Sequence, residues 1–278
     1  MIEIGEHGLN FFRRDLKDVK RTTEAIQEST VYNWLQHTDP SPIHNQASGL
    51  YEPETGDWML RSTEWTDWLT GKLRCLWIHG IPGAGKTILV SHLNKCLQQH
   101  CRSSTDARHA SVYYYCYFGH NQDESMPFLR WLLCQLCRQA NFIPDIVYQM
   151  HQQGWEPSHS EFLLALATTL DSFDTVYITI DAVDESKPRD VLLRVLRDFV
   201  TDSRFRNIQL LVTSRLYIDI ERVLGLLSKS VSMSNDLVTQ DIRRFVQSKL
   251  QSNPKFKQWP KVLIHETVDA LAIGAKGM

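Results

Sequence analysis

The sequence predicts an α/β fold with three layers, in which a parallel sheet carries helices on both faces. Four apolar, strand-like runs alternate with helix-like segments along the chain: residues 73–79, 111–118, 175–181 and 208–214. Crossover helices join parallel strands, and strands that are covered on both faces are apolar along their length, so this alternation is typical of such a sheet. With 278 residues the chain can hold one large α/β domain with helical extensions at both ends.

The segments before the first strand predict a long helix and then an irregular approach to the sheet. Within residues 1–30, apolar side chains recur at helical spacing, which predicts an amphipathic helix that needs a partner surface; they are Leu9, Phe12, Leu16, Val19 and Ile26. Residues 31–72 predict a connector and a short helix. Residues 36–57 are rich in Pro, Asn, Ser, Asp and Gly and predict irregular structure, and residues 58–60 predict a short extended piece. Ser62 fits the N-cap of a helix that ends at Gly71.

Helical segments follow each of the later strands. Their apolar spacing predicts helices over residues 87–99, 127–140, 143–153, 162–170 and 191–200. Residues 215–278 predict mostly helix, and within them residues 236–278 form the start of a further helical domain. The sequence therefore places the sheet within residues 73–235.

The loop between the first strand and its helix carries a phosphate-binding motif. Its eight residues match the pattern G-x-x-x-x-G-K-[ST]: Gly80, Ile81, Pro82, Gly83, Ala84, Gly85, Lys86 and Thr87. In such a P-loop the glycines let backbone N–H groups surround the phosphates, the lysine reaches the β and γ oxygens, and the hydroxyl ligates Mg²⁺. The positive end of the following helix dipole adds to the attraction. The motif predicts that the chain binds a nucleoside triphosphate with Mg²⁺.

Acidic residues follow the strand at residues 175–181. Asp181 ends this buried run, where α/β sheets bind their ligands, and it can hold Mg²⁺ through the ion's water shell. Asp184 or Glu185, one turn further on, can orient or deprotonate an attacking water. The alternative is that these carboxylates only cap a helix that begins near Pro188.

The strand at residues 208–214 delivers Arg215 to the same edge of the sheet. A guanidinium there can bind γ-phosphate oxygens bidentately and so respond to the presence of that phosphate. The alternative is a plain surface arginine.

Composition argues against several classes of partner. The net charge of -2, the pI near 6.6 and the 22% of charged residues give no electrostatic basis for obligatory binding to nucleic acid or an anionic membrane. The sequence holds no run of about 18 apolar residues and no apolar signal-peptide core, so we expect no membrane span and a cytoplasmic location. Cys134 and Cys137 form a single C-x-x-C pair in a helix-like segment, which is more typical of two thiols on a helix face than of a zinc or redox site.

Together these motifs resemble a known family. The runs GIPGAGKT, DAVDE and LLVTSR are similar to those of the NACHT class of STAND P-loop NTPases. The upstream stretches WLQHTDPSPIHNQ and ETGDWMLRSTEWTDWL resemble the nephrocystin-3 N-terminal-like NTPases, which are abundant in fungal NACHT proteins with ankyrin or WD repeats. The likeness covers about residues 25–278. Leu216 departs from the proline that many NACHT sequences have at this place.

The resemblance implies a P-loop NTPase of the ASCE type. Lys86 and Thr87 correspond to the Walker A pair, Asp181 to the Mg²⁺ carboxylate, Asp184 and Glu185 to the acidic pair after it, and Arg215 to the sensor 1 arginine. The family has a five-stranded core with the sensor strand between the two Walker strands. Its base contacts come partly from upstream segments such as residues 58–61, and partly from a winged-helix region that would lie beyond residue 278. Residues 1–30 would be the end of an effector domain.

The function implied is a nucleotide-dependent switch. It would bind ATP or ADP, with GTP as an alternative, hydrolyse the triphosphate slowly, self-associate on activation, and act in signal transduction or self/non-self responses. A second hypothesis is an interaction module that holds nucleotide only as structural support. A small-molecule kinase fits less well, since no acceptor site or arginine-rich lid is evident. A Ras-like GTPase is disfavoured because the sequence has no N-K-x-D motif.

Overall fold

The computed structural model describes residues 6–36, 38–104 and 107–275, and of residues 6–13 it describes the backbone alone. The predicted helix residues Leu9 and Phe12 therefore have side chains outside the described part, as do residues 1–5 and 276–278 of the two predicted extensions. Among the described helices, none combines the length and apolar character that a membrane crossing requires.

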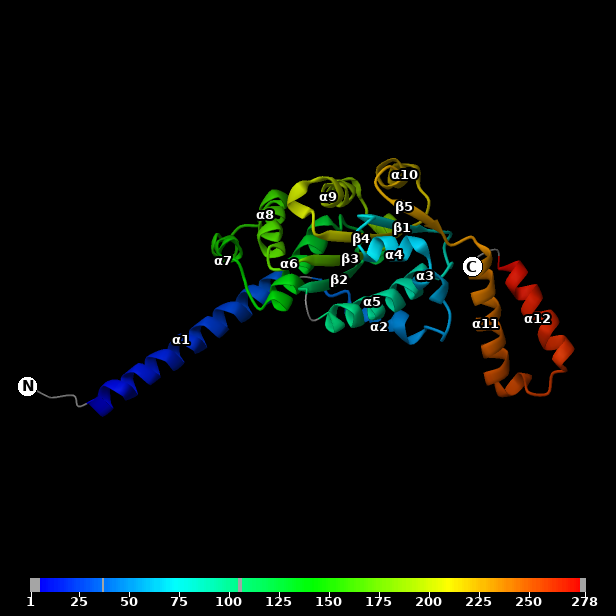
Figure 1. Cartoon of the computed structure of the whole chain (residues 1–278), viewed down its shortest axis with the longest axis horizontal. Helices are drawn as coiled ribbons and strands as arrows, with labels where there is room; N and C mark the ends of the chain where they lie inside the picture. The colour runs from blue at the N-terminus through cyan, green and yellow to red at the C-terminus, as the bar shows by residue number, and fades with distance from the viewer. Residues whose placement is uncertain (1–5, 37, 105–106, 276–278) are drawn as a thin grey trace, which may run out of the picture.

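A five-stranded parallel sheet forms the centre of the domain (Figure 1). Its strands are β1 (Cys75–His79), β2 (His109–Tyr115), β3 (Thr175–Asp181), β4 (Ile208–Ser214) and β5 (Lys229–Ser232). They lie in the order β2-β3-β4-β1-β5, and each neighbouring pair is parallel. The four predicted strands are confirmed. The strand that carries Arg215 lies between those of the P-loop and Asp181, as the resemblance implied.

Residues 215–275 are mostly helical, as predicted, but they also contain β5, which the sequence pattern did not indicate. This strand has four residues, KSVS, of which only Val231 is apolar, so it lacks the buried run by which the other strands were found. It lies at the edge of the sheet and pairs with Leu76–His79 of β1. Backbone pairing with a buried neighbour fixes this segment as a strand, and its own composition does not.

Helices cover both faces of the sheet and confirm the three layers (Figure 1). The side chains of each strand alternate between the two faces: Trp77 packs on one side with the long core of α6, α8 and α9, and Ile78 packs on the other with α4 and α5. The helices after β1 are α5 (Lys86–Ser103), α6 (Ser125–Ala140), α7 (Asp145–Gln152), α8 (His159–Leu170), α9 (Asp190–Thr201) and α10 (Ile218–Leu224). Short 3-10 turns occupy Phe118–His120, Val183–Glu185, Ser203–Phe205 and Pro254–Phe256.

The segment before β1 is more regular than the sequence predicted. Helix α1 (Glu6–Leu35) continues past residue 30, where the predicted helix ends, and α4 (Thr63–Leu69) begins after the predicted N-cap Ser62, whose hydroxyl accepts a hydrogen bond from the Trp65 N–H. The predicted irregular connector contains α2 (Ser41–Gly49), and the predicted extended piece is α3 (Asp57–Leu60), so both of those predictions were wrong.

Tertiary packing explains these two helices. Pro42 lies in the first turn of α2, where its missing N–H costs nothing, and the buried His44 of the same helix hydrogen-bonds through Nδ1 to the Tyr115 hydroxyl at 2.9 Å. In α3 the fully buried Met59 anchors a single turn against the core. Composition therefore misled the prediction, because contacts with the sheet and α5 outweigh local propensity.

The chain continues beyond the sheet as a pair of helices. They are α11 (Asp236–Ser252) and α12 (Lys261–Gly274), which lie side by side at one end of the domain (Figure 1). At the other end, α1 extends away from the domain for most of its length (Figure 1).

Candidate functional site

The P-loop connects the end of β1 with the start of α5. Gly83 and Gly85 have φ angles of 79° and 81°, a left-handed conformation that residues with a side chain rarely adopt. At Gly80 a Cβ atom would lie 2.7 Å from Cβ of Met233, so the loop needs glycine there for close packing. The glycines that sequence reasoning assigned to phosphate binding thus also set the backbone path of the loop.

Lys86 is the first residue of α5, and its side chain folds over the loop. Its Nζ donates hydrogen bonds to the carbonyl oxygens of Gly80, at 2.8 Å, and Ile81, at 3.0 Å. Burial lowers the pKa of Lys86, and the nearby carboxylates of Asp184 and Asp181 partly oppose this shift. The ammonium group therefore lies at the mouth of the loop with acidic residues around it.

Asp181 forms a buried hydrogen-bonded cluster with two threonines. The Thr87 hydroxyl donates to its Oδ2 at 2.7 Å, and the Thr213 hydroxyl donates to its Oδ1. Asp181 is 2% exposed, and burial raises its pKa, while the two hydroxyl donors favour the charged form. Both predicted metal-binding residues are brought together, and Thr213, which sequence reasoning had not singled out, holds the carboxylate in place.

These oxygens fit a magnesium ion. Mg²⁺ prefers hard oxygen ligands and is held in nucleotide sites by one or two protein groups together with phosphates and water. Asp181 and Thr87 supply a carboxylate and a hydroxyl that are in direct contact. In the part of the chain that the structure describes, no three His, Cys, Asp or Glu side chains gather as a metal site.

The acidic pair after β3 lies in a tight turn. Ala182 has a φ angle of 55°, and its N–H donates to the Thr213 hydroxyl at 3.0 Å, which directs the chain into the turn at Val183–Glu185. The Glu185 carboxylate accepts a hydrogen bond from the Phe118 N–H at 3.0 Å, and burial raises the pKa of Glu185. Helix α9 begins after Arg189, so these carboxylates do not cap it.

Asp184 and Arg215 form an ion pair between the ends of β3 and β4. Asp184 is 6% exposed; its Oδ1 accepts the Arg215 N–H at 3.0 Å, and its Oδ2 lies 3.2 Å from the Arg215 Nε. The side chain of Arg215 is 41% exposed. The strand-end argument was therefore sound: it predicted that these residues meet at one edge of the sheet.

A largely apolar pocket of about 290 Å³ adjoins the P-loop. Its walls come from three distant segments, within residues 50–58, 83–89 and 233–245. Aromatic and aliphatic groups dominate the lining and include Tyr51, Trp58, Ile88, Met233 and Phe245. The size and the flat aromatic groups suit a purine base. Of these residues, sequence reasoning reached only Trp58, by way of the family resemblance.

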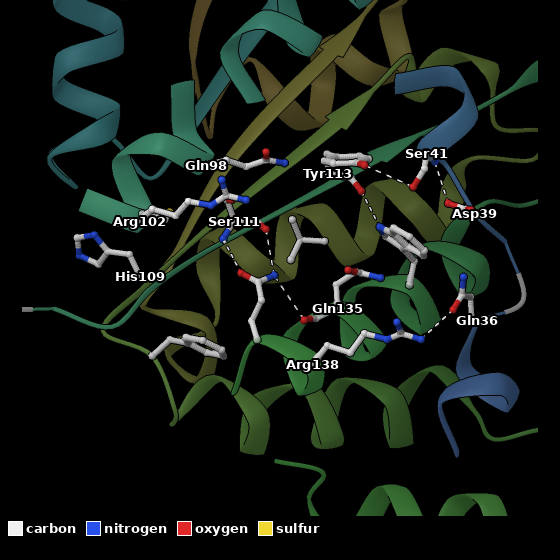
Figure 2. Close-up of a pocket in the computed structure, with 15 residues that line it drawn as sticks. Gln36, Asp39, Ser41, Gln98, Arg102, His109, Ser111, Tyr113, Gln135 and Arg138 are labelled. Carbon is white, nitrogen blue, oxygen red and sulfur yellow. Dashed lines mark hydrogen bonds between the residues drawn. The ribbon is translucent and has the colours of Figure 1, made fainter. Parts of the chain in front are cut away.

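Figure 2 shows a larger pocket, about 620 Å³, along the edge strand β2. The Gln139 side chain bonds to both the N–H and the carbonyl of Ser111, and the Trp131 Nε1 donates to the Tyr113 carbonyl at 2.7 Å. Side chains from α6 thus occupy edge positions where another strand could pair. Because β3 and β4 separate β2 from β1, this pocket is distinct from the P-loop site.

A family model described as "Nephrocystin 3, N-terminal" matches residues 54–215. This range covers more than half of the chain and includes the P-loop, the acidic turn and Arg215. The chain belongs to the nephrocystin 3, N-terminal family. The match begins just before α3 and ends at Arg215, so β5, α11 and α12 lie outside it.

Solved structures show a similar fold. An Aeropyrum pernix ORC1 protein in complex with DNA superposes with a TM-score of 0.52 and 14% identity, over 80% of this chain and 56% of that one. A Pyrobaculum aerophilum Cdc6p has a TM-score of 0.46 and 17% identity, over 75% of this chain and 52% of that one. A Drosophila ORC bound to DNA has a TM-score of 0.48 and 14% identity, over 86% of this chain and 60% of that one. At 14% identity, the likeness to the Aeropyrum pernix protein shows the fold alone, a three-layered P-loop domain. This chain matches little more than half the length of each of these proteins. No curated protein matches the sequence.

Proposed function

We propose that this chain is a nucleotide-dependent switch of the NACHT type that binds ATP or ADP with Mg²⁺. The observation that carries the proposal is the contact between Thr87 of the P-loop and Asp181 of β3, with Lys86 at the loop mouth. This arrangement supports the proposal because triphosphate and Mg²⁺ binding in a P-loop uses a lysine, a hydroxyl and a carboxylate close together. The proposed setting is cytoplasmic signalling or a self/non-self response, in which the active state self-associates.

The residues have separate proposed roles. The loop from Gly80 to Gly85 surrounds the phosphates with backbone N–H groups, and Thr87 with Asp181 holds Mg²⁺. Glu185 orients the attacking water. Arg215 binds the γ-phosphate and exchanges its partner Asp184 for that phosphate, so the ion pair couples the nucleotide state to the turn after β3. P-loop switches without an arginine from a partner protein turn over at roughly 10⁻⁴ to 10⁻² s⁻¹.

The apolar pocket supports a switch because two parts of the chain form it. The P-loop side belongs to the sheet domain, whereas Val238, Asp241, Ile242 and Phe245 belong to α11. A base in this pocket contacts α11 directly, and ligands shift conformations only through such differential contacts. ATP is the favoured nucleotide and GTP the alternative.

A few polar contacts hold α11 against the segment that precedes the P-loop. Asp241 Oδ2 accepts the Gly56 N–H at 2.6 Å, and Lys249 Nζ lies 2.9 Å from Glu52 Oε2. Both segments also line the pocket. Movement of α11 therefore changes the shape of the base site, and occupation of the base site favours one position of α11.

The first test is the binding of a fluorescent ATP analogue by Lys86→Ala. Loss of the ammonium that contacts the phosphates should weaken binding by about two orders of magnitude. Lys95→Ala, which removes an exposed lysine from the same helix, is the matched control and should bind normally. Unchanged affinity in Lys86→Ala would refute the assignment.

A second candidate function is an interaction module that holds nucleotide without turnover. It is favoured by one observation: Asp184 and Glu185 already accept hydrogen bonds from Arg215 and Phe118. Single-turnover hydrolysis by purified protein separates the two functions. Phosphate release that Glu185→Gln abolishes, with nucleotide binding retained, supports the switch; binding without release supports the module.

A further inference from the structure

Helix α1 presents an apolar stripe that nothing in the domain covers. Residues 14–30 are exposed on every side of the helix, and only its last turns, with Val31 and Leu35 buried, pack on the core. Leu16, Val19 and Ile26 are 67%, 64% and 63% exposed. A helix that stands alone in water over this length is marginally stable, so such a stripe indicates a partner.

The spacing of this stripe is that of a coiled coil. Positions alternate at intervals of three and four residues over Leu9, Phe12, Leu16, Val19, Thr23, Ile26 and Thr30. Taking Leu16 as position a of a heptad, Val19 and Ile26 occupy d, and Thr23 and Thr30 occupy a. A strict repeat of this kind over three heptads forms an apolar stripe that is narrower than the apolar face of an ordinary surface helix. Such a narrow stripe is typical of the contact between the helices of a coiled coil.

The two threonines fit into such a seam. The Thr23 hydroxyl donates to the Val19 carbonyl and the Thr30 hydroxyl to the Ile26 carbonyl, each at 2.9 Å. Because these hydroxyls are satisfied within their own helix, they can leave water without losing a hydrogen bond.

We propose that α1 joins several copies of this chain in a parallel coiled coil. The charges beside the seam favour a second copy of α1 as the partner and a parallel direction for it. Asp15 lies at position g and Lys20 at the e position of the following heptad, and in a parallel, in-register pair these two positions of neighbouring helices meet. In an antiparallel pair g positions face g positions and e positions face e positions, so Asp15 and Lys20 of neighbouring helices do not meet.

Position a of the seam holds Leu16, Thr23 and Thr30, and position d holds Val19 and Ile26. This mixed set matches none of the uniform patterns that fix the number of helices, so the seam specifies self-association and not one oligomer size. This assembly is independent of nucleotide, because α1 lies far from the P-loop on the opposite side of the domain from α11 (Figure 1).

The mass of the purified full chain in solution tests the proposal. Light scattering coupled to size exclusion should give at least twice 32.2 kDa for the wild type. The double variant Leu16→Gln/Val19→Gln should give a monomer that still folds, because both side chains are exposed in the single chain. The control Lys17→Gln/Arg21→Gln changes the outer face of the same turns and should assemble normally. A monomeric wild type, or equal masses in both double variants, would overturn the proposal.

Charge exchange tests the direction. Asp15→Lys and Lys20→Asp each place like charges across the seam and should weaken assembly by about tenfold, and the combination of both should restore it. Unchanged assembly in both single variants would show that positions 15 and 20 of neighbouring helices do not meet, and would overturn the parallel arrangement. Neither change touches the nucleotide site. Because Lys86 in turn lies outside the seam, Lys86→Ala should leave the mass of the assembly unchanged even where it abolishes nucleotide binding.

Discussion

Removal of one buried hydroxyl should loosen the edge of the sheet where Asp181 lies. Thr213 is fully buried in β4; it donates to Asp181 and accepts the N–H of Ala182. Thr213→Val keeps the shape of the side chain and removes both hydrogen bonds. The carboxylate then loses a donor worth about 1.5 to 3 kcal/mol, and the Ala182 N–H loses its acceptor at about 1 to 3 kcal/mol.

We therefore expect Thr213→Val to lower the free energy of unfolding by about 3 to 5 kcal/mol. Urea denaturation followed by tryptophan fluorescence measures this change. The control Thr213→Ser keeps the hydroxyl and deletes one methyl group, which should cost about 1 kcal/mol. Equal unfolding midpoints for the two variants would refute the reasoning, because the loss would then come from packing and not from the hydroxyl.

Two further predictions concern the core and the response to acid. Trp68 is fully buried and its Nε1 donates to the Leu210 carbonyl at 2.9 Å, so Trp68→Phe should cost about 2 to 3 kcal/mol in urea denaturation; the same change at the exposed Trp155 should cost nothing measurable. Burial lowers the pKa of four histidines below 6.5: His44, His79, His92 and His100. Below pH 6.5 the unfolded chain then binds more protons than the folded chain, so the free energy of unfolding should fall as the pH drops. His44→Gln should reduce this pH dependence in urea midpoints measured across that range. Equal slopes of midpoint against pH for the wild type and the variant would contradict the prediction.

The parts of the fold that the sequence predicted are those encoded by contiguous residues. The P-loop is one such run, and each of the four long strands is recognised by its own apolar residues. The meeting of Asp181 with Arg215 could also be predicted, because parallel strands end at the same edge of the sheet. In contrast, β5 and α2 were missed because their structure comes from contacts with β1 and with Tyr115, and not from their own composition.

Within the site, the hydrogen-bond partners could not be predicted. Asp184 was expected to act on water or to cap a helix, and the structure shows it as the acceptor of Arg215 from the next strand. Thr213 resembled any strand residue in the sequence, yet its hydroxyl joins Asp181 to the Ala182 N–H. Such roles depend on the register between β3 and β4, which decides which residues of the two strands lie opposite each other. Neither strand carries a local sequence signal for that register.

The apolar pocket beside the P-loop is the part of the candidate site that the sequence predicted least, and the reason bears on the proposed function. Its walls combine residues near 50–58, 83–89 and 233–245, which meet only in the folded chain. The proposed phosphate end of the site is one contiguous loop, whereas the proposed base end includes side chains of α11. A ligand that fills both ends therefore contacts two elements that lie far apart in the sequence. That division gives the proposed switch a physical basis: the loop binds the nucleotide, and the position of α11 responds to it.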